Sequence, residues 1–123
     1  MKALFDTNIL IDYLNGIEAA KAEIERYLHI AISMSTWMEV MVGTKPEEAA
    51  AVRRFLSRFE QIPITAAIAE RAVHIRRETR IRLPDAIIRA TAEGEHALLV
   101  SRNTKDFPEG EPWVRVPYQL QGK

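Results

Sequence analysis

The hydrophobic positions of this chain alternate between short aliphatic or β-branched runs and longer stretches with amphipathic, helical spacing. Such alternation is typical of βαβ units, so the pattern predicts an α/β fold with a mainly parallel sheet. Strands are expected at 2–5, 30–34, 61–64, 98–101 and 113–116. Helices are expected over 8–15, 18–28, 46–59, 65–79 and 85–93, with a short additional helix running through Val42.

Glycine, proline and capping residues set the expected boundaries of these elements. Gly16, Gly43 and Gly94 are predicted to end helices, and Ser35 or Thr36 to cap the short helix. The third strand is interrupted by Pro63, which favours a place at the edge of the sheet. The segment 102–112 is polar and rich in proline and glycine, and is predicted to be a loop.

Composition narrows the class of protein. A chain of 123 residues suits one compact core, so 1–123 is expected to form a single domain. No apolar run approaches the length of a membrane span, and the N-terminus lacks the features of a signal peptide. We therefore expect a cytoplasmic protein without a membrane partner. The absence of cysteine excludes disulfides, thiolate metal sites and cysteine nucleophiles.

Charge is balanced overall but uneven along the chain. The 17 Lys and Arg residues equal the 17 Asp and Glu residues, which argues against indiscriminate coating of nucleic acid. The segment 71–82 nevertheless carries five arginines, and guanidinium groups suit bidentate recognition of phosphate. Arg76 and Arg77 are predicted to contact phosphates, although a solvated helix face explains the same pattern.

Acidic residues recur where predicted strands or loops give way to helices. Asp6 directly follows the first strand, where open α/β sheets bind ligands beyond the strand ends. Glu39 lies in a largely apolar helix start, and Asp85 follows Pro84 at the start of another apolar helix. A first-turn acid facing water explains Glu39 alone, and a capping role explains Asp85 alone. Their shared type of position predicts that the three acids converge on one crevice.

The segment after the fourth strand offers two further oxygen donors. Asn103 follows that strand, and Asp106 lies three residues later; a turn in which these side chains bond their own backbone is the alternative. Clustered carboxylates repel one another unless cations neutralise them, and hard cations such as Mg²⁺ or Mn²⁺ prefer oxygen ligands. The expected chemistry is metal-assisted phosphodiester hydrolysis.

Four ordered blocks of sequence extend along essentially the whole chain, and read MKALFDTNILIDYLNG, ISMSTWMEVMVG, LPDAIIRATA and LLVSRNTKDF. Together they resemble the PIN-domain nucleases, and more closely the VapC-type toxins of prokaryotic toxin–antitoxin pairs. The resemblance implies a three-layer α/β/α PIN fold and a Mg²⁺- or Mn²⁺-dependent endoribonuclease that cleaves structured RNA, either tRNA or rRNA. It also implies a homodimer and a small cognate VapB-like antitoxin.

The resemblance assigns the catalytic acids to Asp6, Glu39 and Asp85. Asp6 and Asp85 are the expected primary metal ligands, followed by Glu39 and Asp106. The last block departs from the family, because Asn103 stands where many relatives have Asp; Asn103 or Asp106 then takes the fourth acidic position, and one tightly held ion is expected. Supporting roles fall to the side chains of Thr7, Asn8, Ser101 and Thr104, although Thr7 and Asn8 also suit a helix cap.

Two readings of function follow from these observations. The first is a metal-dependent endoribonuclease toxin. The second is a catalytically weak PIN-fold binding module that acts through its antitoxin or RNA partner, its site weakened by the neutral Asn103. A stripe of Met34, Trp37, Met38 and Met41 suits either a partner surface or an ordinary core.

Overall fold

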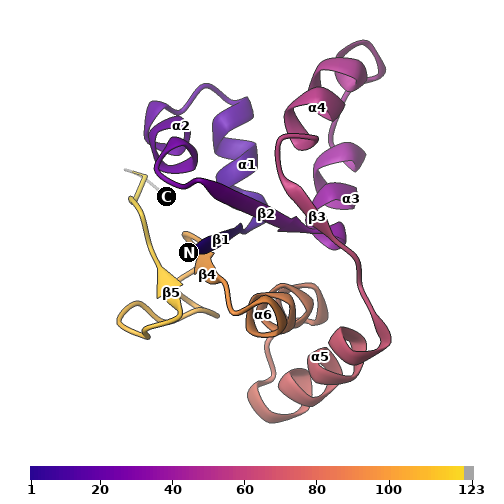
Figure 1. Cartoon of the computed structure of the whole chain (residues 1–123), viewed down its shortest axis with the longest axis vertical. Helices are drawn as coiled ribbons and strands as arrows, with labels where there is room; N and C mark the ends of the chain where they lie inside the picture. The colour runs from indigo at the N-terminus through magenta and orange to yellow at the C-terminus, as the bar shows by residue number, and fades with distance from the viewer. Residues whose placement is uncertain (121–123) are drawn as a thin grey trace.

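The computed structural model describes residues 1–120 and forms five parallel strands flanked by helices (Figure 1). The strands lie in the order β3-β2-β1-β4-β5. Their bounds are β1 Lys2–Phe5, β2 His29–Ser33, β3 Glu60–Ile62, β4 Leu98–Val100 and β5 Val114–Arg115. The helices are α1 Thr7–Leu14, α2 Glu18–Glu25, α3 Met34–Val42, α4 Ala49–Leu56, α5 Ala66–Thr79 and α6 Leu83–Glu95, and a 3₁₀ turn, η1, lies at Pro46–Glu48.

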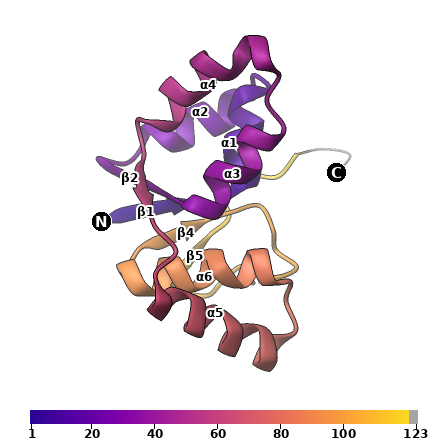
Figure 2. The ribbon, with the colours of Figure 1, turned by 90° about the vertical axis from the view of Figure 1, so that its right-hand side faces the viewer.

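The helices form one layer on each side of the sheet. Helices α1 to α4 lie on one side and α5 with α6 on the other (Figure 2). Adjacent residues of β1 serve opposite layers, because side chains alternate across a strand. Ala3 and Phe5 pack with the first layer, while Leu4 packs with the second. This is the predicted three-layer α/β/α architecture with a parallel sheet.

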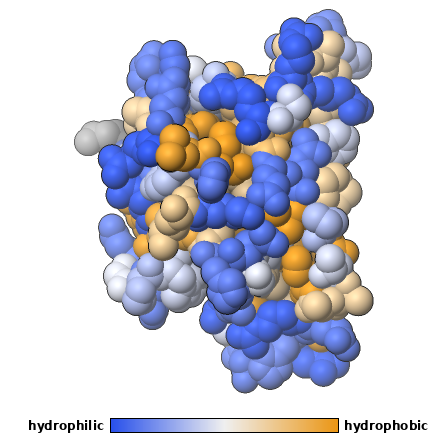
Figure 3. All heavy atoms as spheres, viewed as in Figure 1, coloured by the Kyte–Doolittle hydropathy of each residue, from blue (hydrophilic) through white to orange (hydrophobic). Residues whose placement is uncertain are grey.

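Each layer has its own apolar core. Phe5 meets Tyr27 and Phe59 edge to face, and Phe55 stacks on Tyr13 at 4.3 Å between ring centroids. On the opposite side, α5 and α6 pack together through alanines and isoleucines. In the view of Figure 3 the outer surfaces of the helices are mostly hydrophilic, so the apolar residues serve mainly to join the layers.

All of the predicted helices and strands are present, and the predictions differ from the structure only at the ends of these elements. Helix α3 is capped by Ser33, whose hydroxyl accepts from Ser35 N, rather than by Ser35 or Thr36. Helix α2 ends at Glu25 instead of 28, and the helix predicted from 46 begins as the 3₁₀ turn η1. Gly94 lies inside α6, and His96 instead adopts the left-handed conformation (φ 52°) that ends the helix.

Parallel strands bring their carboxyl ends to one edge of the sheet. The residues that follow β1 and β4, the two adjacent central strands, therefore meet at that edge. Helix α3 begins at the same edge because it directly follows β2, and α6 begins there because it leads back to the start of β4. The acids identified in the sequence lie at these junctions.

Candidate active site

Asp6 is the most buried acid of the candidate site, with 4% of its surface exposed. It follows β1 and caps α1, because its Oδ1 accepts a hydrogen bond from Thr7 N at 2.8 Å. Its own N–H donates to Val100 O at the end of β4. The cap of α1 is therefore Asp6 and not Thr7 or Asn8, and the acid is fixed by backbone contacts on both sides.

The Ser101 hydroxyl holds the second oxygen of Asp6. It donates to Asp6 Oδ2 at 2.6 Å, and it accepts from Asn8 Nδ2 at 3.3 Å and from Asn103 N at 2.9 Å. A serine hydroxyl has one proton and two acceptor positions, so these three bonds use its whole capacity. Because both nitrogen partners can only donate, the Ser101 proton must point at Asp6.

Opposing effects act on the pKa of Asp6. Burial raises it above its ordinary value, and hydrogen bonds from Ser101 and Thr7 N oppose that rise. The negative charges of Glu39 and Asp106 raise it further. The net pKa is raised, so a nearby cation would favour the ionised carboxylate.

Glu39 approaches the site from α3. Thr7 Oγ1 donates to Glu39 Oε1 at 2.6 Å and also lies 3.0 Å from Thr36 Oγ1. Glu39 is exposed, whereas Thr36 is completely buried. The acid is thus tethered through Thr7 while its carboxylate remains accessible to solvent.

Asp85 and Asp106 bring two more carboxyl groups to the site. Asp85 lies in the first turn of α6, and its pKa rises to about 6. The largest cause is burial, followed by the charge of Asp6 and by a hydrogen bond with Asp106. Arg82, just before α6, opposes the shift. The Asp85 carboxyl is therefore close enough to Asp6 and Asp106 for their charges to raise its pKa.

Asn103 and Asp106 form a local turn. Asp106 N donates to Asn103 Oδ1 at 3.2 Å, and Asn103 Nδ2 donates to Asp106 Oδ2 at 3.0 Å. The turn suggested as an alternative by the sequence is thus present, yet Asp106 also acts electrostatically on Asp6 and Asp85. Asn103 orients the loop acid, and Asp106 contributes the charge.

The carboxylate oxygens of this site suit a hard divalent cation, although they do not form a complete coordination site. Within residues 1–120, no group of three or more Asp, Glu or His side chains is arranged so that it could hold a metal ion. Mg²⁺ commonly keeps several waters and binds through one or two carboxylates together with substrate phosphates. The mutual repulsion among Asp6, Asp85 and Asp106 is the observation that fits a cation.

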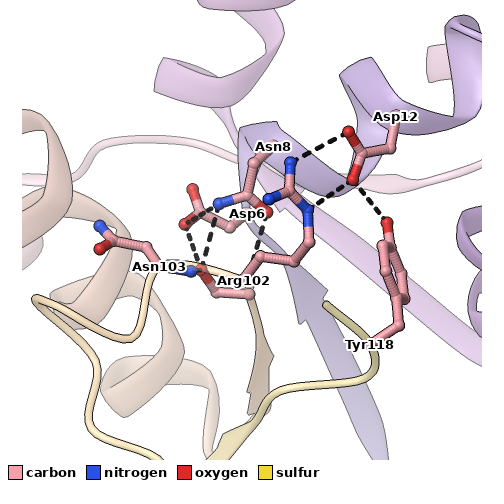
Figure 4. A network of polar contacts seen from close by, with 7 residues as sticks. Asp6, Asn8, Asp12, Arg102, Asn103 and Tyr118 are labelled. Atoms are coloured by element: carbon pink, nitrogen blue, oxygen red, sulfur yellow. Dashed lines mark hydrogen bonds and ion pairs between the residues drawn. The ribbon is translucent and has the colours of Figure 1, made fainter. Parts of the chain in front are cut away.

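A second polar network lies next to the acids (Figure 4). Arg102 donates from both Nε and a terminal nitrogen to Asp12, and Tyr118 donates to the same carboxylate. The Asp12 carboxylate is therefore paired with an arginine and bonded to a tyrosine. Tyr118 carried no sequence signal, because it meets Asp12 across 106 positions of the chain.

The arginines of α5 take different roles. Arg76 donates to the carbonyl oxygens of Arg80 and Ile81, which the end of α5 leaves without helical partners. Arg77 is exposed and lines a shallow hollow on α5. Arg82 is the arginine of this segment whose charge reaches Asp85.

The methionine and tryptophan stripe of α3 divides between core and surface. Trp37 and Met41 pack against the first core, and the Arg53 guanidinium lies 5.2 Å from the Trp37 ring centroid. Met38 is 48% exposed. On the neighbouring surface, a groove of about 660 Å³ is lined by Ile11, Leu14 and Glu39, among others, and reaches from α1 to α4.

Comparison with known proteins gives the family. The PIN domain model matches residues 3–110. Ribonuclease VapC10 of Mycobacterium tuberculosis is 32% identical over 97% of this chain and 95% of its own length. Among solved structures, a toxin-antitoxin complex from Klebsiella pneumoniae is 50% identical, with a TM-score of 0.90 over 96% of this chain and 99% of that one.

A second solved structure is more distant. VapBC2 from Rickettsia felis, bound to a DNA fragment from their promoter, is 28% identical, with a TM-score of 0.76 over 87% of this chain and 91% of that one. Within residues 1–120, no helix combines the length and the apolar character that crossing a lipid bilayer requires. The extent of the matches and the order of the acidic blocks lead to one conclusion: the chain belongs to the PIN-domain family, among the VapC ribonucleases.

Proposed function

We propose that this protein is the toxin of a toxin–antitoxin pair and a Mg²⁺- or Mn²⁺-dependent endoribonuclease acting on structured RNA, either tRNA or rRNA. The observation that carries the proposal is the meeting of Asp6, Asp85 and Asp106 at the carboxyl edge of the sheet, where the charge of Asp106 raises the pKa of Asp6 and the charges of Asp6 and Asp106 raise that of Asp85. The ribonuclease relatives support the activity. We further propose that 1–123 is one PIN domain that works in the cytoplasm.

Asp6 and Asp85 are the proposed primary ligands of the ion, with Asp106 and Glu39 completing the acidic set. Asp6 uses Oδ1 for Thr7 N and Oδ2 for Ser101 and Asn8, which fixes its direction. The negative charges of Asp6 and Asp106 raise the pKa of Asp85, so a bound cation would favour the ionised form of Asp85.

The reaction needs a nucleophile, a proton acceptor and charge neutralisation. A bound divalent ion supplies the Lewis acidity that activates water and stabilises charge on the phosphate oxygens. Thr7 holds Glu39 by Oε1, and we assign Glu39 Oε2 as the acceptor of the water proton. Ser101 and Asn8 keep Asp6 oriented throughout, because their hydrogen bonds are made before substrate arrives.

Two arginines of α5 are the proposed contacts for RNA phosphates. Arg76 and Arg77 lie in the last turn of α5. Arg76 uses part of its donor set on carbonyl groups, but a guanidinium has five N–H donors and retains others. Replacing both residues by Ala should weaken RNA binding and flatten its salt dependence. An unchanged salt slope, measured by fluorescence anisotropy, would contradict a phosphate role.

The groove between α1 and α4 is the proposed docking surface for the VapB-like antitoxin. Its apolar walls include Ile11 and Leu14, and its rim carries Glu39, Glu47 and Glu48. This combination is complementary to an apolar segment with basic side chains. The toxin-antitoxin structures among the relatives support a partner of this kind. A homodimer is also expected, and light scattering of the purified toxin tests it.

RNA cleavage by antitoxin-free protein tests the function. Purified tRNA and rRNA should be cleaved with Mg²⁺ or Mn²⁺ and left intact with EDTA. Asp6→Asn should abolish cleavage, because its amide cannot supply the negative charge, while retaining the fold by circular dichroism. Glu25→Gln, an exposed acid on α2, is the matched control and should retain full activity.

The catalytically weak binding module is the alternative that the neutral Asn103 favours. It predicts that the wild-type protein binds its antitoxin or RNA but leaves every RNA intact with either metal. Cleavage retained in Asp6→Asn would instead contradict the assignment of the acidic site.

A further inference from the structure

Asp12, Arg102 and Tyr118 join three segments that are distant in sequence. Asp12 lies on α1, Arg102 follows β4, and Tyr118 follows β5 (Figure 4). Arg102 donates twice to Asp12, from Nε to Oδ2 at 2.6 Å and from Nη2 to Oδ1 at 3.0 Å. The Tyr118 hydroxyl donates to Asp12 Oδ2 at 2.7 Å. The Asp12 carboxylate thus receives three side-chain donors.

Because Asp12 is buried, each hydrogen bond of this network matters to its carboxylate. Asp12 is 5% exposed, so its carboxylate depends on these donors in place of water. The hydrogen bond to Asp12 raises the pKa of Arg102, which stays charged. Burial, followed by the bond to Asp12, raises the pKa of Tyr118 above its usual value, which keeps its hydroxyl a donor. Loss of any member leaves a buried group with an incomplete set of partners.

Arg102 lies between the two residues that organise the acids. Ser101 donates to Asp6, and Asn103 forms the turn that orients Asp106. The backbone N–H of Arg102 donates to Asn8 Oδ1 at 3.3 Å. This segment from Ser101 to Asp106, here called the site loop, is therefore held by α1 through the backbone of Arg102 as well as through its side chain.

The two holding points on α1 are one helical turn apart. Asn8 and Asp12 are separated by four positions, which places them on the same face of the helix. Asn8 binds the Arg102 backbone, and Asp12 binds its guanidinium. A rotation of the site loop about one contact is thus opposed by the other.

We propose that Asp12, Arg102 and Tyr118 are positioning residues of the active site. They hold the site loop against α1, so that Ser101 orients Asp6 and Asp106 faces Asp85, and through Tyr118 the segment after β5 takes part in ordering the metal-binding acids. The proposal rests on the proposed function for the role of the acids, but the order of the loop is measurable without cleavage.

Tyr118→Phe is the sharpest test, because it removes one hydroxyl and keeps the ring. The chain offers a matched control in Tyr27→Phe. Tyr27 donates to the buried Glu23 at 2.8 Å, and Glu23 is also bound by a second arginine, Arg115. Each substitution removes a tyrosine hydroxyl from a carboxylate–arginine pair, and the Tyr27 hydroxyl does not contact the site loop.

The first readout is amide hydrogen exchange measured by NMR. Tyr118→Phe should speed exchange at the amides of Asn103 and Asp106 by about tenfold, the size expected for one lost bond to a charged group. Exchange in β1 should stay unchanged. Tyr27→Phe should leave both loop amides at the wild-type rate. Equal rates in the two variants, or unchanged loop exchange in Tyr118→Phe, would overturn the proposal.

The second readout is Mn²⁺ affinity, followed by the electron paramagnetic resonance of free Mn²⁺. We expect weaker binding by about three- to tenfold in Tyr118→Phe, and no change in Tyr27→Phe. Arg102→Lys should behave like Tyr118→Phe, because it keeps the charge and loses the two-point contact. Wild-type affinity in both Tyr118→Phe and Arg102→Lys would overturn the proposal.

Failure of the proposed function is recognised separately. If wild-type protein binds no Mn²⁺ and cleaves no RNA, the metal-dependent activity is wrong, while loop exchange still decides whether the three residues position the loop. If the wild type cleaves and the two tyrosine variants have equal kcat and KM, the positioning role is wrong and the function stands.

Discussion

Two networks of the same chemistry lie in different parts of this molecule. In each, a buried carboxylate receives two nitrogens of one arginine and one tyrosine hydroxyl. The site triad consists of Asp12, Arg102 and Tyr118, and the edge triad of Glu23, Arg115 and Tyr27. Their carboxylates are similarly buried, at 5% and 3% exposure. Glu23 also has a longer ion pair, from Oε1 to Arg26 Nε at 3.7 Å. The main difference lies in what Arg102 and Arg115 are attached to.

The attachment of the arginine decides the role of the network. Arg115 is part of β5, so the edge triad fastens α2 to the last strand of the sheet. Arg102 belongs to an irregular loop whose neighbours contact the acids. The same three groups therefore serve mainly stability at the edge, and serve both stability and site geometry beside the acids. The interacting groups alone therefore do not reveal the role of such a network. The residues on either side of its arginine do.

Removal of either carboxylate is expected to give the largest loss of stability. Asp12→Ala and Glu23→Ala should each lower the free energy of unfolding by about 2–4 kcal/mol, because a partly buried arginine loses its counterion. Urea denaturation measures this loss. In RNA cleavage at saturating metal, Asp12→Ala should also lower kcat, whereas Glu23→Ala should retain it. A similar loss of kcat in both variants would erase the distinction between the triads.

Acid should weaken the edge triad. Burial acts to raise the pKa of Glu23, but hydrogen bonds from Arg115 and Tyr27 outweigh it, and the pKa falls below its ordinary value of 4.5. Because the folded-state pKa is lowered, ionised Glu23 adds stability above about pH 4.5 and loses that contribution as pH falls through the folded value.

The measurement compares wild type with Glu23→Gln by urea denaturation at stepped pH. The gap in unfolding free energy should be constant near neutral pH and shrink below about pH 4.5. A gap that is unchanged at low pH would show that the charge of Glu23 does not stabilise the edge triad. An acid-dependent loss that persists in Glu23→Gln must come from other carboxylates.

The smallest expected effect is the coupling between the triads. Tyr118→Phe and Tyr27→Phe should each cost about 1.5 kcal/mol of unfolding free energy, and the double variant should equal their sum within about 0.5 kcal/mol. The reason is that the two networks share no side-chain partner. A coupling energy clearly above that limit would mean that the two arginines act through β5 as one unit.

Local patterns in the sequence predicted much of the fold. Thr65 begins α5 as predicted, because its hydroxyl caps the helix through Ile68 N, and Pro63 correctly marked β3 as an edge strand. The prediction that Gly94 ends a helix was wrong. An exposed glycine within a helix lowers helix stability by only about 1 kcal/mol relative to alanine, and α6 tolerates it. Local sequence signals were therefore mostly sufficient to predict the helices and strands, although not where each of them ends.

The site could be predicted in outline and not in detail. Parallel strands collect their ends at one edge, so the closeness of Asp6 and Asp85 follows from the alternation of strands and helices. The bond from Ser101 to Asp6 and that from Tyr118 to Asp12 join residues 95 and 106 positions apart. Such pairings depend on strand order and on the path of the chain after β5, which no local periodicity specifies.

Mn²⁺ binding to the antitoxin-free protein tests the central claim most directly, since it reports on the acids without requiring the right RNA. Electron paramagnetic resonance should detect one tightly bound ion in the wild type and in Glu25→Gln, and its loss in Asp6→Asn with the fold retained. Wild-type protein that leaves all Mn²⁺ free, or Asp6→Asn that binds the ion as tightly as wild type, would contradict the account.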